Sequence, residues 1–117
     1  MLAKENRLSK KKDFDNVFQF GRSSYNKILG VKVVKNNLNK NRFGVIVSNK
    51  ISKKAVVRNR LKRQIKAILR EENQKLKIGF DCVIISLPAI LEVDFNQIKK
   101  SIIGRFNKLR LYKRKSV

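Results

Sequence analysis

The chain has 117 residues, of which 42% are hydrophobic, enough for one domain with a single modest core. Its 30 Lys and Arg residues against 8 Asp and Glu residues give a net charge of +22, which predicts an anionic partner, either nucleic acid or an anionic membrane. Histidine is absent and Cys82 is the single cysteine, which excludes the commonest general base, an intrachain disulfide and a cysteine-based zinc site. The composition argues against autonomous catalysis, and we assign no catalytic or metal-binding residue.

Apolar stretches are too short for a membrane-spanning helix, which needs roughly 18 to 20 residues. Residues 83–91 are the main candidate, and Pro88 interrupts them. Residues 4–12 are too polar for the apolar middle of a signal peptide. We therefore expect a cytoplasmic protein without a membrane partner.

A first helix is predicted to begin after Ser9, whose side chain can cap it, and to end at Gly21. Phe14, Val17 and Phe18 follow the three-and-four spacing of one helical face. On pattern alone this face is better explained by core packing than by binding.

Two strands are predicted next, at residues 28–34 and 42–48, which are rich in β-branched and apolar side chains. Because only a polar segment separates them, we expect them to pair as a hairpin. Tyr25 belongs either to an additional edge strand or to an early part of the first strand.

A central helix is predicted over residues 52–74, where the apolar period changes to that of a helix. Its apolar arc consists of Val57, Leu61, Ile65, Ile68 and Leu69. The opposite face gathers Asn59, Lys62, Arg63, Lys66 and Arg70, with Arg60 at its edge and Arg58 near the margin of the apolar arc.

The rest of the chain predicts a buried strand at residues 80–87, ended by Pro88, and a last helix that begins with a capping box of Asp94 and Gln97. The buried stripe of this helix is expected to be Phe95, Ile98, Ile102, Phe106 and Leu109. The order helix, strands, helix, strand, helix predicts an α+β two-layer sandwich with helices packed on a small mixed sheet. We expect one domain over residues 1–117, with flexible basic tails at 1–8 and 113–117.

The polar face of the central helix is the main candidate for binding. A solvated surface explains most charge runs, but residues 50–70 contain no acidic residue and so lack the Glu–Lys pairs of a merely soluble helix. Arginine and lysine bind phosphates, and asparagine can bind a base, a ribose or a metal-bound water. Binding of a folded polyanion, above all RNA, is the better explanation.

Residues 50–63, Lys-Ile-Ser-Lys-Lys-Ala-Val-Val-Arg-Asn-Arg-Leu-Lys-Arg, resemble the signature of the bacterial ribonuclease P protein subunit. The opening Arg7, Leu8 and Ser9 with Phe14 and Phe18, and the segments 43–48 and 80–85, are similar to other parts of that family. The resemblance covers nearly the whole chain.

The resemblance implies a protein that pairs with a large catalytic RNA, with one protein per RNA, and helps to remove the 5′ leader from precursor tRNA. In such an enzyme the RNA performs the Mg²⁺-dependent phosphodiester hydrolysis and holds most of the Mg²⁺, so the protein would be a non-catalytic subunit. The family also implies a left-handed βαβ crossover, whereas about 98% of such connections are right-handed.

Two sets of binding residues follow from the resemblance. The set expected to contact the catalytic RNA is Lys53, Lys54, Arg58, Asn59, Arg60, Lys62, Arg63, Lys66 and Arg70. The set expected to line a cleft for the single-stranded leader is Phe14, Phe18 and Lys32. Family members often carry an aromatic residue on the exposed face of the strand at residues 28–34, whereas this chain has Gly30, Lys32 and Val34, so Lys32 would replace a stacking contact by an electrostatic one.

Other classes fit the sequence less well. A ribosomal protein or RNA chaperone would share the charge and the architecture but not the segment at residues 50–63. A helix-turn-helix DNA-binding protein would have a short helix before its basic helix, where this chain has strands. A stand-alone nuclease would need metal ligands that the scattered acidic residues do not supply.

Overall fold

The computed structural model describes residues 2–114 and contains three α-helices, two 3-10 helices and four strands. In chain order the elements are η1 (Lys4–Asn6), α1 (Lys11–Phe20), β1 (Arg22–Tyr25), β2 (Leu29–Lys35), β3 (Arg42–Ile46), α2 (Ala55–Asn73), β4 (Phe80–Ser86), η2 (Pro88–Glu92) and α3 (Phe95–Lys108). The predicted order of elements is confirmed, and Tyr25 lies in a separate edge strand.

The sheet has the strand order β1-β2-β4-β3 and is mixed. Strand β4 pairs antiparallel with β2 and parallel with β3, whereas β1 pairs antiparallel with β2. The predicted hairpin of residues 28–34 and 42–48 is therefore wrong, because β4 lies between the two strands. Since β3 and β4 are parallel, they need a long crossover, which α2 supplies. The left-handed crossover stays a prediction.

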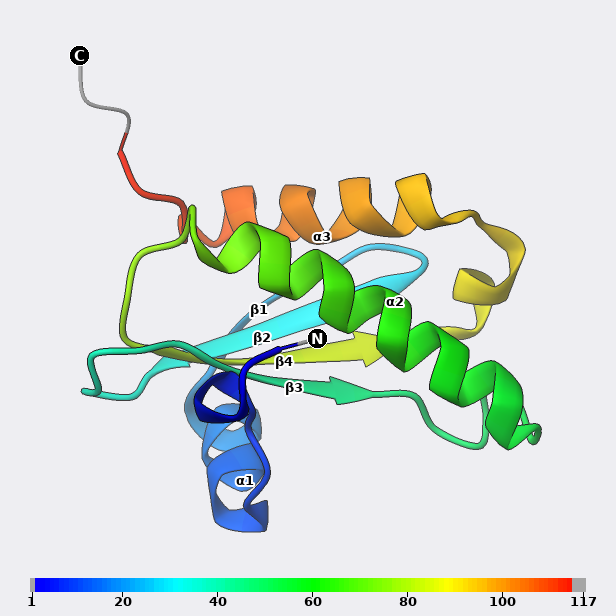
Figure 1. The fold of residues 1–117 in the computed structure, drawn as a ribbon, viewed down its shortest axis with the longest axis horizontal. Helices are drawn as coiled ribbons and strands as arrows, with labels where there is room; N and C mark the ends of the chain where they lie inside the picture. Colours follow the sequence, from blue (N-terminus) through cyan, green and yellow to red (C-terminus); the bar gives the residue numbers. More distant parts are fainter. Residues whose placement is uncertain (1, 115–117) are drawn as a thin grey trace.

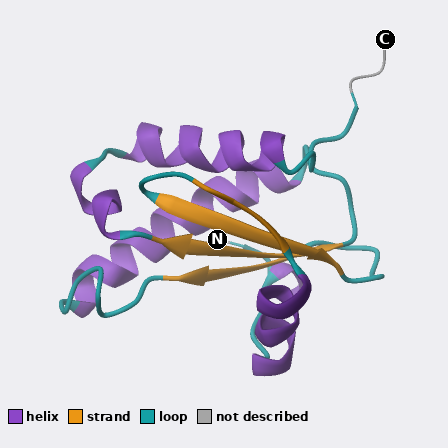
Figure 2. Ribbon diagram, turned by 180° about the vertical axis from the view of Figure 1, so that it is seen from behind, coloured by secondary structure: helices purple, strands orange, loops and turns teal. Residues whose placement is uncertain are grey.

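Helices cover both faces of the sheet. Figure 1 shows α2 and α3 side by side on one face and α1 on the other, and the view from behind shows the strands between them (Figure 2). The larger core lies under α2 and α3, where Val31 and Ile84 of the sheet meet Ile65 of α2. The sandwich of sheet and helices is thus confirmed as an α+β fold, and α1 adds a smaller layer on the opposite face.

The alternation of side chains along β4 explains how one strand serves both faces. Cys82 and Ile84 point into the larger core, whereas Val83 belongs to the smaller core with Val17 and Leu8. A strand that is buried on both faces needs the continuous apolar run seen in its sequence. Cys82 is fully buried, as its position in that run predicts.

The ends of the helices show where sequence signals hold. Asp94 and Gln97 form the predicted capping box, with the Gln97 amide donating to Asp94 Oδ1 at 2.9 Å. Ser9 does not cap α1, because the helix begins two residues later with Lys10 at the N-cap position. Phe95 is also misassigned, since it is 40% exposed while the rest of its predicted stripe is buried.

The segment before α1 is not a free tail where the structure describes it. Leu2 is buried in the larger core, and the Leu8 amide donates to the Phe43 carbonyl at 2.8 Å. The prediction of a flexible tail thus fails for residues 2–8. At the other end the Lys113 amide donates to the Lys75 carbonyl at 3.0 Å, and residues 115–117 lie outside the described part of the chain.

Candidate nucleic-acid interface

Helix α2 presents its polar face away from the sheet because its apolar arc is buried in the larger core. Leu61, Ile65 and Ile68 are buried, and Val57 packs against the same core at the start of the helix. The residues on the opposite side form what we call the cationic face, defined by Asn59, Arg60, Lys62, Arg63, Lys66 and Arg70. All six are exposed or only half-buried, as the helical period predicts.

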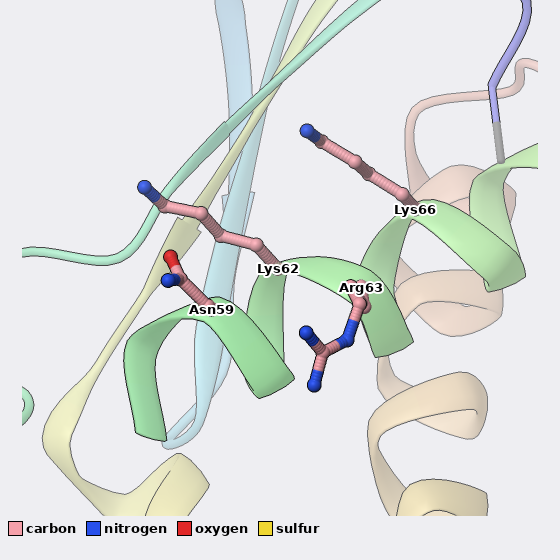
Figure 3. A pocket seen from close by; sticks show the side chains of 4 residues that line it. All are labelled: Asn59, Lys62, Arg63 and Lys66. Atoms are coloured by element: carbon pink, nitrogen blue, oxygen red, sulfur yellow. The ribbon is translucent and has the colours of Figure 1, made fainter. Parts of the chain in front are cut away.

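Part of the cationic face is hollowed into a pocket of about 350 Å³ lined by Asn59, Lys62, Arg63 and Lys66. Figure 3 shows Lys62 and Lys66 reaching in the same direction from successive turns, with the Asn59 amide beside the end of Lys62. The Arg63 guanidinium turns to another side of the helix (Figure 3). The four side chains therefore offer two ammonium groups and an amide to one ligand, and a guanidinium to a neighbouring one.

The N-terminus of α2 carries positive side chains, where helices usually carry negative ones. Acidic residues and a side-chain cap are both missing from its first turn, and Lys54 occupies the N-cap position with Lys53 before it. Positive charges at a helix N-terminus are unfavourable, because the unpaired amide groups already make that end positive. An anion bound near these two exposed lysines would relieve the conflict.

Arg58 differs from the other predicted contacts. Its Nη1 donates to the Ser52 carbonyl at 2.8 Å, so the side chain folds back along the loop that leads into α2. The residue is half-buried, as its place at the margin of the apolar arc suggests. Arg58 thus ties down the entry to the helix, and the structure does not bring it into the cationic face.

The acidic groups that form ion pairs form them with other residues than those of the cationic face. Within residues 2–114, ion pairs occupy Asp13, Asp15, Glu71, Glu72 and Asp81, and Asp94 serves as a helix cap. None of those ion pairs involves a residue of the cationic face. Within the described residues, the cationic face is thus free of ion pairs.

Helix α1 brings the second set of predicted residues to the other face of the sheet. Phe14 packs closely over Gly44 of β3 and is half-buried, so it contributes mainly to the smaller core. Phe18 is 40% exposed, and the Lys32 ammonium lies 5.7 Å from the centre of its ring. That distance suits a cation–π contact, so Phe18 and Lys32 meet on an accessible surface.

Arg42 fixes the position of α1 against the sheet. It donates to Asp81 from Nε at 2.8 Å and from Nη2 at 2.7 Å, and its Nη1 lies 3.3 Å from Asp13 of α1. The hydrogen bonds to Asp81 are the main reason that the pKa of Arg42 is raised, ahead of the nearby Asp13 charge. Asn36, in the loop after β2, donates to the same carboxylate at 2.9 Å, so Asp81 of β4 holds Arg42 of β3 and this loop, and Arg42 links them to α1.

Sequence reasoning missed an aromatic residue on the α1 side of the sheet. Tyr25 of β1 lies opposite Gly30 of β2, and a Cβ atom on Gly30 would collide with the Tyr25 ring. The available signal was the glycine itself, because an isolated glycine within a strand often marks a close approach. Its neighbour in the fold could not be named without the register.

Residues 2–114 hold neither a membrane-spanning helix nor a metal-binding cluster. In this part of the chain no helix has the length and apolar character to cross a membrane. The same residues hold no cluster of three or more His, Cys, Asp or Glu side chains arranged to bind a metal ion.

Fold and site together define a class: a small, strongly basic α+β protein with an unpaired cationic helix face suited to a polyanion. The family called Ribonuclease P matches residues 2–110. The chain is 37% identical over 110 residues to the ribonuclease P protein component of Alkaliphilus metalliredigens, covering 94% of this chain and 98% of that one. It is 40% identical over 110 residues to the same component of Clostridium botulinum strain 657, covering 93% and 98%.

A solved structure agrees with these sequence relatives. A mutant RNase P protein from Staphylococcus aureus superposes with a TM-score of 0.86 and 25% identity, covering 93% of this chain and 92% of that one. The chain therefore belongs to the ribonuclease P protein family. The family resemblance drawn from residues 50–63 is confirmed.

Proposed function

We propose that the chain is the protein component of ribonuclease P and promotes removal of the 5′ leader from precursor tRNA. The observation that carries the proposal is the cationic face of α2, which has no ion-pair partner in residues 2–114 and begins within residues 50–63, the segment that resembles the family signature. A catalytic RNA is the proposed partner of this face. The RNA would act as the catalyst, with Mg²⁺ held mainly by RNA.

The proposed contacts with the catalytic RNA use phosphates and the edges of folded RNA. Lys62 and Lys66 would bind neighbouring phosphates, and Asn59 would bind a base edge, a ribose or a metal-bound water. Lys53 and Lys54 would hold a phosphate at the positive end of α2. Arg58 would act at most through its remaining donors, since one of them is used by Ser52.

The leader is proposed to bind on the other face of the sheet, along α1. Phe18 offers an exposed aromatic surface on which a base can stack without sequence preference, and Lys32 adds a charge beside it. Phe14 would support this surface from below, because it is packed over Gly44.

The placement of the two surfaces suggests how the protein helps. The α2 and α1 surfaces lie on opposite faces of the sheet (Figure 1), so one protein can contact two RNA segments at once. Catalytic RNA and precursor repel one another, and a protein of charge +22 between them lowers that repulsion and the concentration of Mg²⁺ required. One protein per catalytic RNA and a location in the cytoplasm are part of this proposal.

Reconstitution tests the proposed function. Precursor tRNA is incubated at low Mg²⁺ with the protein alone, with the cognate catalytic RNA alone, and with both. We expect accurate 5′ maturation only when both are present. Robust cleavage by RNA-free protein would refute a catalytic role of the RNA, and a mixture that is no more active than the RNA alone would refute the proposed subunit role.

A further inference from the structure

The α1 side of the sheet carries an exposed aromatic row that extends beyond Phe18. In the register of β1 and β2, Ser23 lies opposite Lys32 and Tyr25 opposite Gly30. Side chains of opposed residues share one face of a sheet, so Tyr25 lies on the same face as Lys32. Gly30 and Lys32 are two residues apart along β2, which places Tyr25 roughly 7 Å farther along the strand.

Tyr25 combines packing against the sheet with exposure to solvent. Its ring lies over Gly30, where any larger residue would displace it. The residue is nevertheless 46% exposed, and its backbone is fixed from α3, since Arg105 Nη1 donates to the Tyr25 carbonyl at 2.8 Å. A ring that rests on backbone and stays open to solvent is a preorganised surface for stacking.

Coverage of a glycine in a strand would by itself explain part of this arrangement, because an aromatic ring over a glycine stabilises sheets. It does not account for the charge and the second aromatic group nearby. Lys32 is two residues along β2 from Gly30, over which the Tyr25 ring lies, and its ammonium is 5.7 Å from the Phe18 ring. Two aromatic surfaces with a cation beside them suit a single strand, whose bases stack and whose phosphates need a counter-charge.

We propose that Tyr25 is a base-stacking residue of the leader site and binds a leader nucleotide neighbouring the one at Phe18. The proposal rests on the proposed function and deepens it. An aromatic group that β2 lacks at Gly30 is supplied by the edge strand β1, so the site of this chain is built from two strands and α1. Lys32 then binds the phosphate between two stacked bases.

Binding to the reconstituted enzyme tests the role of Tyr25, with leader-bearing precursor and mature tRNA compared. Tyr25→Ala is expected to weaken binding of the precursor at least roughly fivefold, because loss of one stacked base has about that effect. The affinity for mature tRNA is expected to stay unchanged. Tyr25→Phe keeps the ring and is expected to bind like wild type. Phe20→Ala removes an aromatic side chain that is 66% exposed and lies outside the sheet-facing stripe of α1, and it serves as the matched control.

A second arm replaces single leader nucleotides by abasic ones. At one leader position the abasic nucleotide should weaken binding to the wild-type enzyme by the same factor as Tyr25→Ala does. It should cause no further loss of affinity in the Tyr25→Ala enzyme, since both changes remove the same stacking contact. Tyr25→Leu covers Gly30 without an aromatic face, so it should bind as weakly as Tyr25→Ala even if the alanine variant is poorly folded.

The outcomes separate this proposal from the one on which it rests. Wild-type preference for the leader that persists unchanged in Tyr25→Ala and Tyr25→Leu would overturn the role of Tyr25 and leave the proposed function intact. Equal loss for precursor and mature tRNA would also overturn it, in favour of a structural role. A wild-type enzyme that does not distinguish precursor from mature tRNA would instead contradict the leader site itself.

Discussion

Removing three charges from the pocket of α2 should change how salt affects binding of the catalytic RNA. The variant Lys62→Ala/Arg63→Ala/Lys66→Ala takes three lining side chains from the pocket. Leu61, Ile65 and Ile68, which hold the helix on the sheet, are untouched and buried, so the fold should be retained. Each lost phosphate contact leaves one counterion fewer to be released on binding.

The size of the effect follows from that counterion release. Each phosphate contact contributes roughly 0.9 to the slope of log affinity against log salt, as measured for duplex DNA, so three contacts contribute about 2.7. Over a fourfold rise in salt, wild type should therefore lose roughly 40-fold more affinity than the variant. If Arg63, which turns away from the two lysines, contacts no phosphate, the slope should fall by about 1.8 instead.

The assay is a titration of labelled catalytic RNA over a range of KCl concentrations at constant Mg²⁺, with circular dichroism to verify folding. A matched variant, Lys35→Ala/Lys100→Ala/Lys108→Ala, removes the same charge from exposed lysines elsewhere. We expect its slope to stay close to that of wild type, because long-range charge without phosphate contact releases few counterions. Equal slope changes in both triple variants, or none in either, would refute the assignment of the RNA contacts to α2.

Three other changes probe stability and the α1 surface. Asp81→Ala should lower the free energy of unfolding in urea by about 3 kcal/mol, because it leaves buried donors without their carboxylate. Asp15→Ala, at an exposed ion pair, should lower it by less than about 0.5 kcal/mol. Similar losses in the two variants would contradict the role given to burial. Burial raises the pKa of the Cys82 thiol, so the unfolded state loses this proton first, above about pH 8.5, and stability should fall by about 1 to 2 kcal/mol from about pH 8 to pH 10. In urea unfolding, Cys82→Ala should lose less stability than wild type between about pH 8 and pH 10. The same pH dependence in both proteins would contradict the contribution assigned to Cys82. Phe18→Ala should weaken binding of leader-bearing precursor at least roughly fivefold more than binding of mature tRNA. Lys32→Ala should reduce precursor affinity less in the double variant than it does alone, because the two side chains are in contact. Equal loss of affinity for both RNAs would favour a purely structural Phe18.

The elements of the fold could be predicted because their periods are local properties of the sequence. The buried residues of α2 and the capping box of α3 are read from positions three and four apart. The pairing of strands is different, because it depends on contacts between distant residues. Residues 28–34 and 42–48 are neighbours in sequence, yet β4 pairs with both and separates them. No local pattern encodes that insertion.

The site shows the same division. The cationic face follows from the helical period, so its members could be named from the sequence. The position of Arg58 near the margin of the apolar arc likewise indicates that it differs from them. The contact of Lys32 with Phe18 and the ring of Tyr25 over Gly30 depend on how α1 and β1 cross the sheet. The ion-paired group of Arg42, Asp13 and Asp81 joins three elements and has no sequence signature.

The place of β4 in the sheet sets an order for folding during synthesis. Until residues 80–86 have been made, β2 can pair only with β1, and β3 has no strand beside it apart from an isolated bridge to Arg7. A two-stranded ribbon is marginally stable in water, so a chain shortened before Phe80 should not hold either core together. The pairs that β4 makes with β2 join residues more than forty positions apart, which makes loop closure a slow step. Helix α2 is therefore made before the sheet that supports it, and its charged surface gains a fixed shape only when the last strand arrives.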